Sequence, residues 1–232
     1  MPVSPRITPA RVTFAAAVLG SIAAPVTAVA YLHTSEGIDY LDQPSIAAWV
    51  NPATGLLQPV FDQVGIDRTY LIGTQLLAVL WPVTVAGAIT AARDRGPAGR
   101  ERVWWLITLI GYGWFALGLV AFSVLAGVLS PAHAIADLVF LAGMLPGLLI
   151  SLIGSTLLGI SLLRRRYPAR ATAWLLTLAI PCWLVANLIL GHNSIGLLPL
   201  MWAWALALRS PVEKEGASPR RSDDRSHRRI GL

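Results

Sequence analysis

The chain has 232 residues, of which 55% are hydrophobic and only 13% are charged, and its mean hydropathy is +0.63. A soluble globular domain carries about 25% charged residues, so this composition excludes one. The charges lie at the chain ends and in a few loops, and long uncharged apolar runs separate them. In lipid only helices and closed barrels satisfy their own backbone hydrogen bonds, and continuous rather than alternating apolarity favours helices. We therefore expect an all-α integral protein of the cell membrane.

The net charge of +6 and the pI near 10.2 do not indicate nucleic-acid binding. The basic residues flank the apolar runs, as membrane topology requires, and no basic stripe alternates with exposed aromatic residues. The single cysteine, Cys182, lies inside an apolar run, which excludes a disulfide framework and a cysteine-based metal site. No Walker loop, dinucleotide fingerprint, HExxH, CxxC or GxSxG motif occurs. We predict no cofactor, no metal site and no enzyme activity.

Six apolar runs are each predicted to cross the bilayer as a helix. In chain order they cover residues 12–32, 70–92, 103–129, 134–163, 171–190 and 195–208. Residues 1–11 precede this six-helix transmembrane bundle (12–208), and residues 33–69 form a long outer loop. Residues 209–232 form a polar tail rich in Arg and Ser, which we expect to be disordered.

The charges of the connecting segments predict the orientation of the bundle. Residues 1–11, the loops 93–102 and 164–170, and the tail are net basic, whereas the outer loop is acidic and the remaining loops contain no Lys or Arg. Basic segments stay in the cytoplasm, so both termini are predicted to be cytoplasmic. Anionic lipid is expected at the tail and at Arg164, Arg165 and Arg166.

Two of the six spans leave an alternative open. The first ends near Ala28-Val29-Ala30, which has the form of a signal-peptidase site, but its apolar length favours an uncleaved span. The last run has 14 residues, which rise only about 21 Å and fall short of a hydrocarbon core of about 30 Å. The last pair of spans is therefore predicted to be thin or re-entrant, with its turn at residues 191–194.

The outer loop is predicted to contain two short interfacial helices. Residues 46–49 form a short apolar patch, and apolar residues recur at helical spacing over 56–64. These helices either cap the outer mouth of the bundle or rest on the headgroups. Tyr31 and Tyr70 are expected at the outer headgroup level as aromatic anchors.

The fourth run carries five small residues at intervals of four, and this ridge predicts close helix packing. The residues are Gly143, Gly147, Ser151, Ser155 and Gly159. The ridge drifts around the helix and is expected to contact more than one neighbour, and Pro146 is expected to kink the helix. Packing within the monomer is the favoured interpretation, and a homodimer seam is the alternative.

A layer of polar side chains is predicted near the outer leaflet. Gln75 and Asn187 both lie about 25–27 Å above the inner boundary, and His192 and Asn193 lie close to that level. Polar groups in hydrocarbon need partners, so these residues are expected to face inward. They either bind a small ligand or join helices through hydrogen bonds, and the second interpretation is favoured.

Asp137 is the remaining candidate ligand-binding residue. It lies four residues after His133, so the two share a helical face, and a metal site or proton relay with His192 is conceivable. However, His133 and His192 differ in depth by about 10 Å or more, which is too far for a shared metal ion.

The segment from Gly191 to Pro199, followed by an apolar run and Arg209, resembles uncharacterised multi-pass membrane proteins of high-GC, actinobacterial-type bacteria. The resemblance implies no activity. The favoured function is that of a noncatalytic scaffold, an accessory subunit of a membrane complex or an oligomeric partner. One alternative is a small transporter or ligand-binding protein that uses the polar layer. The other is an outward-facing enzyme that uses Asp137 with His133 or His192.

Overall fold

The computed structural model describes residues 8–129 and 134–209. In that part of the chain every regular element is helical, which confirms the all-α prediction. The N-terminal residues 1–7, His133 and the tail from residue 210 lie outside the described residues. The elements are α1 (Pro9–Leu32), the 3-10 helix η1 (Ile38–Asp42), α2 (Pro44–Val64), α3 (Ile66–Arg95), α4 (Arg100–Leu129), α5 (Ala134–Val139), the π-helical turn η2 (Phe140–Met144), α6 (Leu145–Arg164), α7 (Arg170–Thr177), α8 (Ala179–Leu190), the 3-10 helix η3 (Ile195–Leu197) and α9 (Leu198–Ala207).

Four helical segments of the described chain are long and apolar enough to cross a membrane: α1, α3, α4 and the continuous segment from η2 to α6. Helices α7 and α8 meet the same criterion together, as a pair bent by 51°. The sixth predicted run, η3 with α9, is a shorter apolar helix over Ile195–Ala207. Four or five helices of this kind fit an integral membrane protein.

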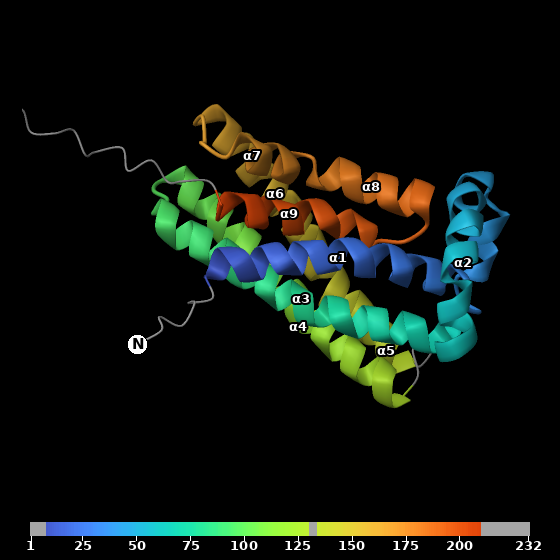
Figure 1. The fold of residues 1–232 in the computed structure, drawn as a ribbon. Coiled ribbons are helices and arrows are strands. Elements are labelled where there is room, and N and C mark those ends of the chain that lie inside the picture. Colours follow the sequence, from blue (N-terminus) through green and yellow to red (C-terminus); the bar gives the residue numbers. More distant parts are fainter. Residues whose placement is uncertain (1–7, 130–133, 210–232) are drawn as a thin grey trace, which may run out of the picture.

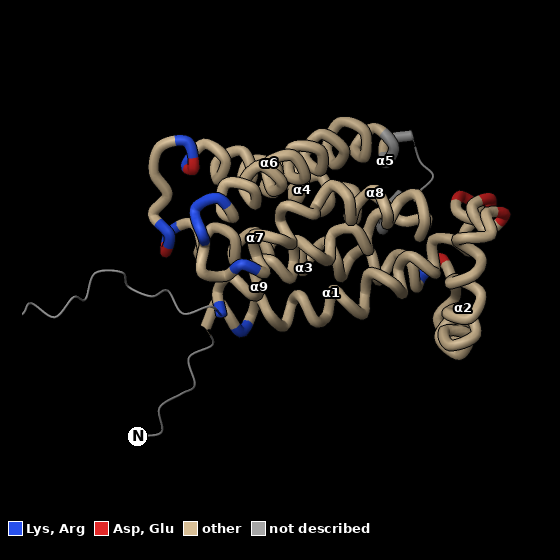
Figure 2. The backbone as a smooth tube through the Cα atoms, turned by 90° about the horizontal axis from the view of Figure 1, so that it is seen from above, with Lys and Arg blue, Asp and Glu red and all other residues tan. Residues whose placement is uncertain are grey.

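The bundle has a basic end and an acidic end (Figure 2). At the basic end lie the arginines of the α3–α4 and α6–α7 connections. At the acidic end lie the carboxylates that follow α1 and those near the end of α2. Helix α1 begins and α9 ends at the basic end (Figure 1), so an N-terminal and a C-terminal element share that end.

The outer loop contains one long helix rather than the two short interfacial helices predicted. Helix α2 runs unbroken for 21 residues through Pro52 and Pro59, and it lies across the acidic end of the bundle (Figure 1). Ile46, Val50 and Phe61 form one buried stripe on it and pack against the end of α1. Each proline removes one backbone donor, and the burial of this stripe offsets that loss. The two predicted short helices are therefore parts of one helix.

The predicted span 171–190 is bent, because Pro181 has no N–H to donate to the carbonyl of Thr177, where α7 ends. Near Pro146, where a kink was predicted, the chain forms the π-helical turn η2, which ends at Met144. A wide π turn accommodates the backbone carbonyl that a proline leaves unpaired. The π turn lies toward the acidic end of the bundle, whereas the break between α7 and α8 lies nearer the basic end, because α7 has 8 residues and α8 has 12.

Helix α9 lies at the centre of the bundle and packs against α1, α3 and α7. Together, η3 and α9 rise only about 20 Å, compared with about 36 Å for the 24 residues of α1. The loop before η3 does not reach the end of α1 but lies beside Ala24. The Ser194 hydroxyl donates a hydrogen bond of 3.0 Å to the carbonyl of that residue. The bundle axis is therefore without a central helix near the acidic end.

The small-residue ridge of α6 lies inside the monomer. A Cβ atom added at Gly147 would collide with the backbone of Phe115 on α4, and Gly143 lies against Gly118 of the same helix. At Gly159 the backbone neighbours belong to α7, at Ala173 and Thr177. The ridge thus contacts two neighbouring helices, and these contacts fill it along most of its length. Ser151 and Ser155 are fully buried within it.

Candidate functional site

A cavity of about 380 Å³ opens near the acidic end. Residues of α1, α3, α4, η2 and α8 line it, together with the loop 191–194. Its position follows from the helix lengths, because the central helix stops short of this level. The cavity lies among the helices of the bundle, a region that is close-packed in most proteins.

Three tyrosines and one carboxylate line the part of the cavity nearest the acidic end. Tyr31 comes from the last turn of α1, Tyr70 from the start of α3 and Tyr40 from η1, while Glu36 lies in the loop between α1 and η1. The ring centroid of Tyr31 lies 5.5 Å from that of Tyr70 and 6.5 Å from that of Tyr40. We call these four residues the tyrosine cluster.

The loop between α8 and η3 contributes a fourth aromatic ring, that of His192, and several polar groups. The His192 ring lies 4.8 Å from the Tyr31 ring, measured between centroids, and 6.4 Å from the Tyr70 ring. The His192 Nδ1 atom lies 2.7 Å from the Ser194 hydroxyl, whose proton is donated to a backbone carbonyl. The Ser194 backbone N–H also donates to Nδ1, at 3.3 Å. Burial lowers the pKa of His192 to about 4, so the ring is neutral at physiological pH.

The opposite wall of the cavity is apolar. Its residues come from α4 and η2: Phe115, Leu119, Phe122, Phe140 and Met144. The helical spacing of the α4 residues places them on one face. Phe140 and Met144 are the first and last residues of the π turn, which has more residues per turn than an α-helix. The cavity therefore joins a polar, aromatic side to an apolar side.

Three of the five predicted ligand-binding residues line this cavity: Asn187, His192 and Asn193. The Asn187 side chain also donates a hydrogen bond of 2.8 Å to the carbonyl of Trp183 in its own helix. Gln75 is exposed on α3, so the expectation that it faces inward was wrong. Its neighbour Thr74 is buried and lines the cavity instead, because adjacent helical positions differ by about 100°. The side chain of Asp137 and all of His133 lie outside the described residues.

The sequence interpretation missed the tyrosine cluster. Tyr31 and Tyr70 were read as separate headgroup anchors, and Tyr40 and Glu36 were read as parts of a loop. The only available signal was that all four lie near the predicted outer boundary. Contact between the end of α1 and the start of α3 depends on how the loop 33–65 folds back, and that could not be read from spacing.

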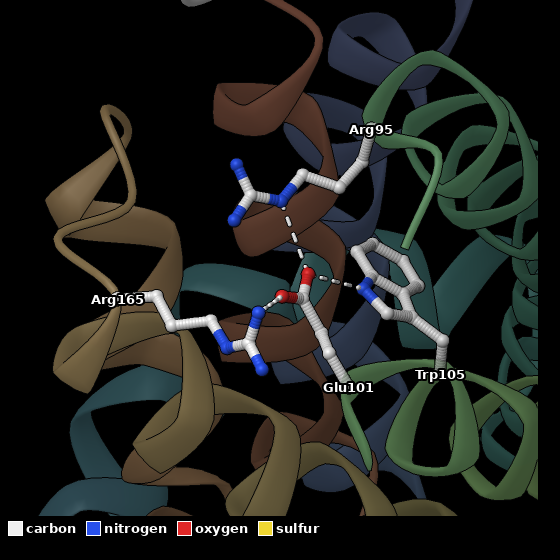
Figure 3. A network of polar contacts seen from close by, with 4 residues as sticks. All are labelled: Arg95, Glu101, Trp105 and Arg165. Atoms are coloured by element: carbon white, nitrogen blue, oxygen red, sulfur yellow. Dashed lines mark hydrogen bonds and ion pairs between the residues drawn. The ribbon is translucent and has the colours of Figure 1, made fainter. Parts of the chain in front are cut away.

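A second polar cluster lies at the basic end, around a buried carboxylate (Figure 3). The Glu101 side chain is only 2% exposed, and its Oε1 atom lies 3.0 Å from Nε of Arg95. Its Oε2 atom lies 3.3 Å from Nη1 of Arg165, and the Trp105 indole N–H donates to Oε1 at 3.4 Å. Figure 3 shows the two guanidinium groups on either side of the carboxylate. We call these four residues the Glu101 cluster.

The Glu101 cluster joins three helices at their basic ends: α3 through Arg95, α4 through Glu101, and α6 through the adjacent Arg165. The Arg95 guanidinium also lies 5.3 Å from the centre of the Tyr167 ring. Burial raises the pKa of the Tyr167 hydroxyl, which keeps that ring neutral. The sequence treated these arginines only as topology signals, because nothing in their spacing shows that they share one acid.

Among the residues that the structure describes, no three His, Cys, Asp or Glu side chains gather closely enough to hold a metal ion. Comparison with known protein families, curated proteins and solved structures gives no match for this chain. The class that the fold defines is an all-helical protein whose apolar helices fit a membrane. Within that class, the distinguishing features are the cavity near the acidic end and the Glu101 cluster at the basic end.

Proposed function

We propose that this chain is a cell-membrane protein that binds a small ligand in the cavity, with the acidic end facing the outside of the cell. In this proposal the chain crosses the bilayer six times, with both termini in the cytoplasm. The bent pair α7–α8 is the fifth crossing, and η3 with α9 is a short sixth crossing. The arginine-rich loops at one end support this orientation, because basic segments remain in the cytoplasm. The burial of Ala28, Val29 and Ala30 within α1 supports a retained first span.

The cavity itself is the observation that carries the ligand-binding proposal. Its volume of about 380 Å³ lies within the range of about 300–1,000 Å³ that is usual for small-molecule sites. Such sites combine an apolar lining with a few converging polar groups, and the same combination is found here. If the polar residues served only to join helices, they would be expected to fill the space between them.

Oligomerisation through the α6 ridge has less support than the sequence suggested, because the ridge is filled by contacts within the monomer. An enzyme that uses Asp137 with His133 or His192 remains a prediction from the sequence. A scaffold role likewise remains a prediction. Neither accounts for the cavity.

Thermal stability of the purified protein in an uncharged detergent tests the ligand-binding proposal. The protein is screened against four classes of compound: organic cations, organic anions, neutral polar molecules and neutral apolar molecules. We expect at least one class to raise the melting temperature in a saturable way. Leu119 lines the cavity and is 6% exposed, so Leu119→Trp should fill the space and abolish that shift.

The matched control is Leu117→Trp on the same helix, because Leu117 is 74% exposed on the outer surface of α4. That variant should keep the ligand-induced shift. Thr74→Phe provides a second way to fill the cavity should Leu119→Trp fold poorly. If no class stabilises the wild-type protein, or if the shift survives in both filled variants, the proposed function is wrong.

A further inference from the structure

We propose that the ligand is an organic cation, an ammonium group attached to an apolar body. The ammonium group lies in the tyrosine cluster, and the apolar body lies against the wall formed by α4 and η2. This inference rests on the proposed function and specifies the chemical class of its ligand. It follows from three features of the cavity: the aromatic rings, the balance of charge and the division between polar and apolar sides.

The aromatic rings form a site suited to a cation. A positive charge is attracted to the face of a tyrosine ring within about 6 Å of the centroid, and sites for quaternary ammonium groups use several such rings. Tyr31 stands at the centre, with Tyr40, Tyr70 and His192 all within 6.5 Å of it between centroids. These rings come from α1, η1, α3 and the α8–η3 loop. A cation in the cavity, against these rings, would therefore contact four separate segments of the chain.

The charge balance at the cavity is negative. Among the described residues that line it, Glu36 is the one carboxylate, and none is Lys or Arg. His192 is neutral, so it does not oppose a cation. Arg68 lies at the same end but is exposed on α3 and does not line the cavity.

The apolar wall distinguishes an organic cation from a metal ion. Calcium and magnesium require several oxygen ligands at about 2.0–2.6 Å, whereas this wall offers Phe115, Leu119 and Met144. Those side chains gain by covering an apolar group, because that removes apolar surface from water. The polar side and the apolar side together match the two ends of one amphiphilic cation.

Binding of choline, of its neutral isostere 3,3-dimethylbutan-1-ol, and of benzyltrimethylammonium tests this inference. Isothermal titration calorimetry on the full-length protein in an uncharged detergent measures each affinity. Choline should bind and its neutral isostere should not, because the two differ chiefly in charge. Benzyltrimethylammonium should bind more tightly than choline, because its ring reaches the apolar wall.

Three substitutions locate the site. Glu36→Gln and Tyr31→Leu should each weaken binding of benzyltrimethylammonium by about tenfold, while Tyr31→Phe keeps an aromatic face and should retain most of the affinity. The matched control for charge is Asp39→Asn, since Asp39 is an exposed carboxylate of η1 that does not line the cavity. It should change the affinity less than twofold.

Equal binding of choline and its neutral isostere would overturn the inference, and so would equal effects of Glu36→Gln and Asp39→Asn. If another compound class stabilises the protein, and only through the unfilled cavity, the organic-cation inference fails while the proposed ligand-binding function stands. If no class binds, the proposed function itself fails. The screen of four compound classes therefore distinguishes failure of the organic-cation inference from failure of the proposed ligand-binding function.

Discussion

The carboxylate of Glu101 shows how a single residue can set the position of several helices. It is almost fully buried, and two arginines that are themselves partly exposed reach it from α3 and from the end of α6. A buried charge without a partner is costly, whereas a paired one holds its partners in a defined arrangement. The first turn of a helix also favours a negative charge. Glu101 therefore fixes where three helix ends meet.

Replacement of Glu101 by Gln tests this role. We expect the free energy of unfolding to fall by about 2 kcal/mol, because both ion pairs are lost and two guanidinium groups are left facing each other. The exposure of the arginines limits the loss, since they can turn toward water. A denaturant titration of the purified protein in detergent measures the change.

The control for this variant is Asp94→Asn, which removes a carboxylate from the same connection. Asp94 is exposed, and its loss should change stability by no more than about 0.5 kcal/mol. Equal stability of Glu101→Gln and the wild-type protein would show that the Glu101 cluster does not hold the helices together.

Tyr112, in the middle of the bundle, also joins three helices through its side chain. Its hydroxyl group lies 2.8 Å from that of Ser155 on α6 and accepts a hydrogen bond of 3.1 Å from the Trp204 indole on α9. The Trp105 ring packs against Trp204 at 5.2 Å between centroids. Aromatic and polar contacts thus continue from the Glu101 cluster along the bundle axis.

At the scale of elements, the close approach of α4 and α6 determines the shape of the bundle. The Gly118 position on α4 faces the backbone of η2, the turn that leads into α6, and an added Cβ would lie 2.6 Å from the carbonyl carbon of Gly143. Backbone cannot move aside as a flexible side chain can. The two helices can therefore approach this closely only where at least one of them has a glycine at the contact.

The substitution Gly118→Ala should lower the free energy of unfolding by about 1–3 kcal/mol, because the extra methyl group forces the two helices apart. Gly113→Ala on the same helix is the matched control, because a Cβ there meets nothing within 4 Å. The control should be neutral or more stable by up to about 1 kcal/mol, since Ala favours a helix over Gly. Equal losses in the two variants, measured by the same denaturant titration, would contradict this account of the helix contact.

The apolar runs were sufficient to predict most of the helices. Continuous hydrophobicity marks α1, α3 and α4 to within a few residues, because lipid exposure leaves little choice of side chain. Proline was a poorer guide. Pro181 lies where its span bends, but Pro52 and Pro59 lie within the unbroken helix α2, where tertiary burial outweighs the lost donors.

The candidate site was predictable only in part, because its geometry depends on helix rotation and loop path. Depth along a helix grouped Asn187, His192 and Asn193, and all three line the cavity. Depth does not fix rotation, so Gln75 was assigned to the interior although Thr74 lies there instead. The tyrosine cluster depends on the path of the loop after α1, for which the sequence has no periodic signal.

For the whole molecule, the bundle is asymmetric in charge and in packing. The basic end is closed by ion pairs and by the contacts of α9, whereas the acidic end holds the cavity and is crossed by α2. In the proposed orientation the tightly packed half lies toward the cytoplasm. The half with the cavity lies toward the outside, where a water-soluble ligand would enter.

Cysteine labelling in intact cells tests the central claim most directly, namely that the cavity opens to the outside. The single native cysteine is first removed as Cys182→Ser, and one new cysteine is then introduced at Asn193 in the cavity lining, at Gln75 on the outer surface of α3, or at Arg93 at the basic end. We predict that a membrane-impermeant maleimide labels Asn193→Cys in intact cells. It should not label Gln75→Cys, which faces lipid in this orientation, and it should label Arg93→Cys only after the membrane is permeabilised. Labelling of Arg93→Cys in intact cells, or failure to label Asn193→Cys until permeabilisation, would contradict an outward-facing cavity.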